Sequence, residues 1–323
     1  MKDRRPDASA GGIASRRAQT GDRAFKILRM VELTGKSVLV TGANSGIGLE
    51  ACVQLTQMGA DVTMVARDRS KGEAARAEVD TRARDALGNA DRERVQQPAL
   101  LLCDMASQSS IRVLAKEFRR THARLDILIN NAGSVSPTRE LTADGIEKTF
   151  AVNHLGYFLL TNLLLDLIVQ SAPARIVNMS SIGHRSGTMD FDDLNFETER
   201  YSIMKAYARS KLANVLFTRE LSKRLKSQGV TVNCLHPGAV STNIWSHAMW
   251  WARPFLSLAK LFMVTPEKGG ERIVYLATSP EVEGKTGGYY ENNTLVDPSP
   301  LAQDDAVAAK LWDVSANLVR LAA

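Results

Sequence analysis

The sequence is poor in the residues that build metal sites and disulfide frameworks. Among 323 residues there are only three cysteines and five histidines. Cys52, Cys103 and Cys234 are far apart and lie in apolar surroundings, so we interpret them as small core residues in a reducing compartment. No histidine, cysteine or carboxylate cluster has the spacing of metal ligands, so we expect no metal site.

Long hydrophobic runs are also missing. A membrane-spanning helix needs roughly 18 or more consecutive apolar residues, and no such run occurs. The best candidate, LGYFLLTNLLLDLIV, is interrupted by Asn162 and Asp166, which favours a buried amphipathic helix. The amino terminus has no apolar core of a secretory signal, so a cytoplasmic protein is expected. Peripheral contact with a membrane is left open.

Charge of one sign is concentrated in a single place. Residues 1–30 account for five of the six net positive charges, and the remainder of the chain is close to neutral. The excess therefore does not predict a nucleic-acid partner. The head is rich in glycine, alanine and serine, which predicts a flexible basic tail over 1–30 and one domain over 31–323. A weak organelle-targeting or membrane-surface role for the tail stays open.

From Lys36 onward, short apolar runs alternate with helical stretches. Apolar strands without polar alternation, separated by helices, predict an α/β fold with a doubly wound parallel sheet of the Rossmann type, with about seven strands in a single domain. The strands are expected in KSVLVTG, ADVTMVARD, PALLLCD, LDILINNAG, ARIVNMSS, VTVNCLHPG and GKTGGYYEN. The helices are expected over 47–58, 69–87, 107–122, 143–170 and around Tyr207.

The segment TGANSGIG, from Thr41 to Gly48, follows the first predicted strand and opens the first predicted helix. Glycines permit a tight turn and let a pyrophosphate approach the backbone, while the helix amino terminus offers free N–H groups to it. The strand–turn–helix context supports a dinucleotide-binding loop. Its expected members are Gly42, Asn44, Ser45, Gly46, Ile47 and Gly48.

The end of the next strand, VARDRSK, indicates which dinucleotide is bound. An NAD site usually offers a carboxylate to the ribose diol here, but Ala66 occupies that place and Arg67 follows. A cation favours a 2′-phosphate, so NADP(H) is preferred over NAD(H). Arg69 and Lys71 lie near, and we interpret them as ordinary exposed cations.

These pieces occur together with further motifs in a fixed order. TGANSGIG is followed by NNAG at 130–133, NHLG at 153–156, SS at 180–181, a Tyr-x-x-x-Lys and HPGAVST at 236–242. From about residue 34 to 315, the chain resembles the short-chain dehydrogenase/reductases. SKLANVLFTREL and SPEVEGKTGGYYEN look most like the retinol dehydrogenase branch. The resemblance implies NADP(H)-dependent hydride transfer between nicotinamide and a hydrophobic carbonyl or alcohol.

The same resemblance implies roles for individual residues. Tyr207 would exchange the proton, Lys211 would stabilise the phenolate and bind the nicotinamide ribose, and Ser181 would polarise the carbonyl. Asn153 would hold a helix distortion and a water that links the lysine to solvent. Asp104 would bind adenine, with Met105 beside it. The remaining cofactor contacts would come from Asn131, Ala132 and Gly133 on the adenine–ribose side, and from Pro237, Gly238, Val240 and Thr242 at the nicotinamide end.

Two Tyr-x-x-x-Lys pairs compete for the catalytic role, because Tyr201 precedes Lys205 and Tyr207 precedes Lys211. The tyrosines are six residues apart, so on one helix they would point in different directions. Only the second pair opens a sustained apolar stripe, formed by Leu212, Val215, Leu216, Leu221 and Leu225. We therefore assign the chemistry to Tyr207 and Lys211. Tyr201 is expected in a loop near the substrate mouth.

Two histidines need a structural interpretation. His184 follows Ser181 closely, but no Gly-x-Ser-x-Gly elbow supports a hydrolase. His236 precedes Pro237 and is expected to be a structural hydrogen-bonding group.

The substrate side is expected in two segments, the stretch between Ser181 and Tyr207 and the segment 243–265. The second contains Trp245, Trp250 and Trp251 and suggests a lid over an apolar substrate, although a core, dimer or membrane contact is left open. A homodimer also stays open, since family members often pair through the helices around Asn153 and Tyr207. The alternatives are a steroid or lipid-ketone reductase and a catalytically idle NADP-binding interaction protein.

Overall fold

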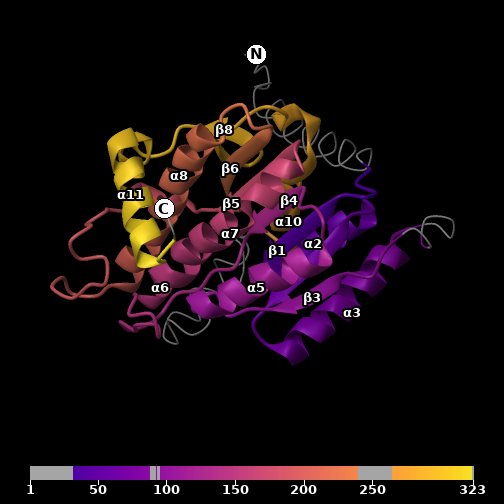
Figure 1. Ribbon diagram of the computed structural model, residues 1–323, viewed down its shortest axis with the longest axis horizontal. Coiled ribbons are helices and arrows are strands. Elements are labelled where there is room, and N and C mark those ends of the chain that lie inside the picture. Colours follow the sequence, from indigo (N-terminus) through magenta and orange to yellow (C-terminus); the bar gives the residue numbers. More distant parts are fainter. Residues whose placement is uncertain (1–31, 88–91, 93–94, 239–263, 322–323) are drawn as a thin grey trace, which may run out of the picture.

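The computed structural model describes residues 32–87, 92, 95–238 and 264–321 (Figure 1). The predicted tail over 1–30 lies outside the described residues, and so does nearly all of the predicted lid over 243–265. The described part contains one eight-stranded sheet with the order β3-β2-β1-β4-β5-β6-β7-β8. Its strands are β1 Ser37–Thr41, β2 Asp61–Ala66, β3 Ala99–Leu102, β4 Ile127–Asn130, β5 Ala174–Met179, β6 Val230–His236, β7 Tyr289–Glu291 and β8 Thr294–Val296.

The first seven strands are parallel, and the order reverses direction between β1 and β4. This is the doubly wound arrangement that the alternating pattern predicts. The central strands are buried on both faces: every residue of β1 and of β4 is buried. A strand covered by helices on both faces has no solvent side, which explains why these segments lack polar alternation.

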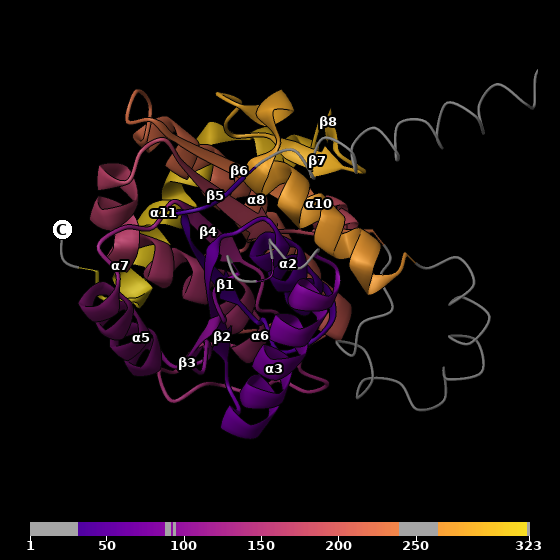
Figure 2. The ribbon, with the colours of Figure 1, turned by 90° about the vertical axis from the view of Figure 1, so that its right-hand side faces the viewer.

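Helices form a layer on each face of the sheet (Figure 2). One layer contains α2, α3 and α10, and the other contains α5, α7, α8 and α11. Their bounds are α2 Gly46–Gln57, α3 Arg69–Asp85, α5 Gln108–Thr121, α6 Lys148–Phe150, α7 Gly156–Gln170, α8 Ile203–Arg224, α10 Pro266–Thr278 and α11 Asp305–Leu318.

The most apolar helix is part of this core. Lys148–Gln170 is long and apolar enough to cross a membrane by length and composition, yet 67% of its most apolar window is buried inside the protein. Its residues Phe158, Leu160 and Leu164 are completely buried. The segment packs as the buried helix that Asn162 and Asp166 led us to expect.

Three features differ from the expectation. An eighth strand, β8, pairs antiparallel with β7 at the sheet edge, because Asn292 and Asn293 adopt positive φ angles and close a two-residue hairpin turn. The helix expected from residue 143 begins at Lys148, where the Glu147 carboxylate accepts hydrogen bonds from Thr149 N and Phe150 N. Two helices, α10 and α11, are absent from the expected elements; α10 packs on α2 and α11 packs on α8.

Candidate active site

The candidate site residues are gathered at one edge of the sheet. Gly42, Arg67, Asp104, Asn131, Ser181 and Pro237 each follow the carboxyl end of a parallel strand, directly or within three residues. Carboxyl ends of parallel strands meet at one edge, and the strand order reverses there between β1 and β4. Residues that are far apart in the sequence are thereby brought together at one edge of the sheet.

The turn after β1 depends on two glycines. Gly42 has φ +65°, and a Cβ added there would lie 2.7 Å from the Cα of Ala132. A Cβ on Gly48 would lie 2.4 Å from Asn131 Nδ2 and 2.5 Å from the carbonyl oxygen of Gly42. Only glycine fits both positions, so the loop is drawn tightly against the NNAG segment.

The helix that follows this turn has an uncapped amino terminus. Ser45 is the N-cap residue of α2, and its side chain makes no capping hydrogen bond. The first N–H groups of a helix need partners from outside the helix, and an anion is the partner they favour electrostatically. An uncapped terminus behind a glycine turn fits the pyrophosphate of a dinucleotide.

The NNAG segment is fixed to β1 by hydrogen bonds. Thr41 Oγ1 accepts from Asn131 N at 2.9 Å and from Ala132 N at 3.0 Å. Asn131 Nδ2 donates to the carbonyl oxygens of Thr41 and Gly42, and Tyr157 donates its hydroxyl to the Ala132 carbonyl oxygen at 2.7 Å. The backbone at 131–133 is held rigidly beside the phosphate loop.

The residues after β2 differ in their availability. Arg67 is exposed. Asp68 follows it, but its carboxylate accepts a hydrogen bond from Lys71 N at 2.8 Å and caps α3. The first carboxylate in the sequence after β2 therefore caps a helix, whereas the Arg67 guanidinium faces solvent.

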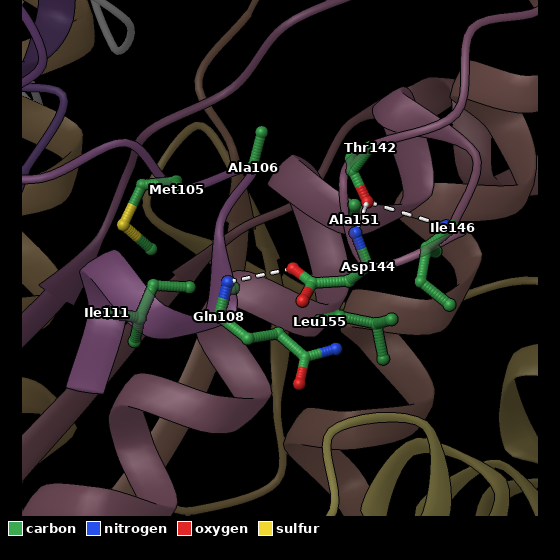
Figure 3. Close-up of a pocket in the computed structure, with 10 residues that line it drawn as sticks. Met105, Ala106, Gln108, Ile111, Thr142, Asp144, Ile146, Ala151 and Leu155 are labelled. Carbon is green, nitrogen blue, oxygen red and sulfur yellow. Dashed lines mark hydrogen bonds between the residues drawn. The ribbon is translucent and has the colours of Figure 1, made fainter.

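The residues after β3 surround a very small cavity of about 10 Å³ (Figure 3). Gln108 N donates to Asp144 Oδ2 at 3.0 Å, so Asp144 ties the start of α5 to the loop before α6. Met105 is buried, and its Cε lies 3.0 Å from where a Cβ on Gly156 would be. Asp104 Oδ1 accepts from Ala106 N at 3.0 Å. This cavity has room for about one water, so it is no substrate pocket.

Ser181 and Tyr207 meet although 26 residues separate them. Ser181 lies just beyond β5, its Oγ accepts from Gly183 N at 3.1 Å, and a Cβ added to Gly183 would lie close to both Ser181 Oγ and Tyr207 Cε1. Burial is the main influence on Tyr207 and raises the pKa of its phenol, while the nearby Ser181 hydroxyl acts in the opposite direction. We expected the neighbouring lysine to lower this pKa, and in the free protein burial dominates instead.

Lys211 lies one helical turn after Tyr207 and is almost completely buried. Its Nζ is 5.7 Å from the centroid of the Tyr207 ring and donates to the Met179 carbonyl oxygen at 3.1 Å. Burial lowers the pKa of Lys211 to about 8. Because this buried ammonium is poorly solvated, it would interact strongly with a negative charge that develops beside it.

Asn153 lies in the predicted helix distortion. Residues Ala151–Leu155 form one turn of π-helix between α6 and α7. The Asn153 amide donates to the Ser134 carbonyl oxygen and to Ser210 Oγ, both at 3.0 Å, and accepts from Ser134 N at 2.8 Å. The backbone carbonyl oxygen of Asn153 accepts from Asn214 Nδ2 at 2.9 Å. The widened turn thus connects the loop after β4 to the Tyr207 helix.

The nicotinamide end is described only in part. Gly238 has φ +96°, and an added Cβ would lie 2.4 Å from Arg272 Nη1, so the backbone needs glycine there. Arg272 donates to the Pro237 carbonyl oxygen at 2.5 Å. Val240 and Thr242 lie outside the described residues.

Two residues of the site were not predicted from the sequence. Asn214 is fully buried, and its amide donates to both Asn153 O and Met179 O at 2.9 Å. A Cβ on Gly183 would lie 3.3 Å from Tyr207 Cε1 and 3.5 Å from Ser181 Oγ. An asparagine inside the apolar stripe of α8 was a signal for the first, whereas nothing in the sequence pointed to the second.

The two histidines differ in their outcomes. His184 Nδ1 lies 2.7 Å from the Ser181 carbonyl oxygen, and its Nε2 accepts from Ser299 N at 3.1 Å. Both ring nitrogens are engaged with the backbone and neither contacts the Ser181 hydroxyl, which agrees with a structural role. His236 Nδ1 is buried without a hydrogen-bond partner, so the expectation of a hydrogen-bonding role is not met at that atom.

A parallel Rossmann sheet with a glycine loop, a serine beyond β5 and a Tyr–Lys helix defines a class of oxidoreductase. The family model of short chain dehydrogenases matches residues 36–251, and the chain belongs to this family. It is an oxidoreductase acting on CH–OH or C=O groups. Within the family it falls in the retinol dehydrogenase branch.

Known relatives support both the family and the branch. Human retinol dehydrogenase 14 is 43% identical, with 97% of this chain and 96% of the relative covered. Human retinol dehydrogenase 13 is 44% identical, with 90% and 86% covered. Among solved structures, an uncharacterised protein from Mycobacterium paratuberculosis has a TM-score of 0.70 at 32% identity, with 91% and 97% covered. A short chain dehydrogenase from Escherichia coli complexed with NADPH has a TM-score of 0.62 at 25% identity, with 81% and 98% covered.

Proposed function

We propose that this chain is an NADP(H)-dependent oxidoreductase that interconverts a lipophilic aldehyde or ketone, of the retinal type, and its alcohol. The observation that carries the proposal is the contact of Ser181 with Tyr207 above a buried Lys211, at the sheet edge that also holds the uncapped glycine loop. When bound, the cofactor would supply or accept the hydride at its nicotinamide ring.

The residues of the chain account for the proton and the charge. The raised pKa keeps Tyr207 protonated at neutral pH, so its hydroxyl is a proton donor to a carbonyl oxygen. Ser181 can donate to the same oxygen and stabilise its developing negative charge. Once Tyr207 has given its proton, the Lys211 ammonium stabilises the phenolate, and this stabilisation is strong because both groups are buried.

Two exposed apolar side chains next to the catalytic pair support a lipophilic substrate. Ile182 directly follows Ser181 and is 45% exposed. Met204 lies one helical turn before Tyr207 and is 55% exposed. Large apolar side chains at these two positions would be covered by an apolar ligand more favourably than by water. The retinol dehydrogenase relatives agree with this class.

Turnover decides between the proposed function and its alternatives. NADPH oxidation is measured with all-trans retinal, a medium-chain aldehyde, a steroid ketone and a quinone. We expect the highest kcat/KM for the retinoid or the aldehyde. A preference for the steroid ketone would support the lipid-ketone alternative. NADPH binding without turnover of any of the four would instead support an interaction protein.

The cofactor preference rests on Arg67, and Arg67→Ala tests it. Removing a charge-assisted bond to a 2′-phosphate costs about 1.5–3 kcal/mol, so NADPH binding should weaken roughly 10- to 100-fold while NADH binding changes little. Dissociation constants from cofactor fluorescence measure both. Arg69→Ala, an exposed cation two residues further on, is the matched control. Equal losses for both cofactors in Arg67→Ala would contradict the 2′-phosphate role.

A further inference from the structure

A fully buried arginine lies inside the candidate active-site helix. Arg209 is only 2% exposed and is among the largest fully buried side chains of the described residues. It stands on α8 between Tyr207 and Lys211. None of the roles discussed above uses this residue.

The guanidinium of Arg209 holds the segment that precedes α8. Its Nη1 donates to the carbonyl oxygen of Asp193 at 2.7 Å and to that of Leu194 at 3.3 Å. Its Cζ lies 4.0 Å from the centroid of the Phe196 ring. Tyr201 contacts the same ring edge-on, with centroids 5.3 Å apart. Arg209, Phe196 and Tyr201 form a cation–aromatic–aromatic stack.

The centre of this stack has an unfavourable backbone conformation. Phe196 has φ +53° and is 3% exposed. A bulky residue in the left-handed region costs roughly 1–2 kcal/mol. Such a residue persists only where its surroundings over-determine it, and the Tyr201 ring and the Arg209 guanidinium belong to those surroundings.

Charges around the arginine order the rest of the segment. Arg209 Nη2 lies 3.6 Å from Glu199 Oε2. The Asp193 carboxylate accepts from Glu197 N, Thr198 N, Thr198 Oγ1 and Glu199 N at 2.5–3.1 Å. These bonds hold the pKa of Asp193 well below its usual range. The segment 190–201 is therefore closed on itself and attached to α8 through buried Arg209 and, at Glu199, through exposed Lys205.

Fold stability alone is a weak explanation for this arrangement. Burial lowers the pKa of Arg209, which means that its charged form is poorly solvated, and its Nε has no hydrogen-bond partner among the described residues. Replacing buried charged groups by apolar residues is often neutral or stabilising. A buried cation at this position is better explained by what it positions.

The segment lies between the two catalytic elements. It leaves the turn after Ser181 and ends where α8 begins, one turn before Tyr207. Its last residue, Tyr201, donates to the Ser136 carbonyl oxygen at 2.9 Å. Ser136 follows Ser134, which is bonded to Asn153. The segment is thus tied to the loop after β4 that also holds Asn153, and it lies in the chain between Ser181 and Tyr207.

We propose that Arg209 is a positioning residue that fixes the segment 190–201 as a rigid wall of the substrate mouth and thereby determines which size of lipophilic carbonyl reaches Tyr207. This inference rests on the proposed function for its substrate. The wall itself is a property of the folded chain and can be measured without any substrate.

The test compares Arg209→Met with Arg224→Met. Arg224 stands on the same helix and places its guanidinium 4.1 Å from the Trp312 ring, on the side of α11 and away from the wall. Hydrogen exchange should show about tenfold or greater loss of protection over 193–201 in Arg209→Met and none there in Arg224→Met. KM for retinal should rise about tenfold with kcat and the NADPH dissociation constant little changed, while KM for a short aldehyde stays constant.

Several outcomes would overturn the proposal. Unchanged protection over 193–201 would show that Arg209 does not hold the wall. Equal losses of kcat for long and short substrates would place its effect on the chemistry of Tyr207. If Arg224→Met behaved identically, a loss of helix stability alone would explain the effect of Arg209→Met. If Arg209→Met does not fold, Arg209→Lys keeps the charge and removes the planar fork, and the same results are expected in weaker form.

The two proposals can fail separately. If the unaltered protein reduces none of the test substrates, the proposed function fails and the size-selection part of this inference falls with it. Hydrogen exchange over 193–201 still decides whether Arg209 anchors the wall.

Discussion

The two Tyr-x-x-x-Lys pairs have the same spacing and opposite surroundings. Lys205 is 58% exposed and forms an ion pair with Glu199, whereas Lys211 is buried and donates to a backbone carbonyl oxygen. Tyr201 donates to the Ser136 carbonyl oxygen and lies 3.3 Å from Glu147 Oε1. Tyr207 instead contacts the hydroxyl of Ser181.

We infer from this difference why the proton donor should be Tyr207 and not Tyr201. Burial and the Glu147 carboxylate together raise the pKa of Tyr201 to about 12, because a negative charge there would face another. The Tyr207 phenolate would face a buried ammonium and a hydroxyl donor. Helical spacing brings a lysine near either tyrosine, but only the second pair has a cation without a carboxylate partner.

The largest expected effect in this comparison comes from Tyr207→Phe. It removes the proton donor and leaves the ring in place, so kcat should fall about 10²–10⁴-fold. NADPH binding should change little, because the phosphate loop and Arg67 are untouched. Steady-state kinetics with retinal and cofactor fluorescence measure the two quantities. A variant that keeps its kcat would show that Tyr207 is not the proton donor.

Much of the fold was accessible from the sequence, for identifiable reasons. Strands such as 37–41 are buried on both faces, so their apolar runs are unambiguous, and glycines with positive φ mark the turn that follows. The helix phase on which the choice of Tyr207 rests is observed: α8 begins at Ile203, after Tyr201, and the five residues of its predicted apolar stripe are buried. The catalytic role of Tyr207 stays a prediction.

The remaining features depend on contacts between distant residues. The π-helical turn at Asn153 is fixed by Ser134 and Asn214, and no local pattern specifies those partners. α11 was missed because its apolar pattern is weak: its buried residues are Ala308, Leu311 and Ser315, and the serine is buried because its side chain bonds His154. Arg209 looks like a surface residue in the sequence, since only the Phe196 stack shows where its charge is accommodated.

A smaller effect is expected in the pH dependence of stability, through Lys211. Its pKa is about 8 in the folded protein and 10.5 ordinarily, so the unfolded chain binds more protons between these values. Stability relative to Lys211→Met should therefore rise as pH increases from 8 to 10.5, by at most about 3.5 kcal/mol at roughly 1.4 kcal/mol per unit. Urea unfolding of both proteins across this range measures it. A constant difference would mean that Lys211 is not desolvated.

The smallest effect should come from Tyr201→Phe. The change removes the hydrogen bond to the Ser136 carbonyl oxygen, which is worth about 0.5–1.5 kcal/mol, and keeps the ring that contacts Phe196. KM for a bulky carbonyl should shift a few-fold at most, with kcat unchanged. Lys205→Met is the control from the same pair and should alter neither constant, because its ammonium is solvated beside Glu199. A loss of kcat in Tyr201→Phe would exchange the roles of the two pairs. In that case the proton donor would be Tyr201, the tyrosine beside a carboxylate, and not Tyr207, the tyrosine beside the buried ammonium.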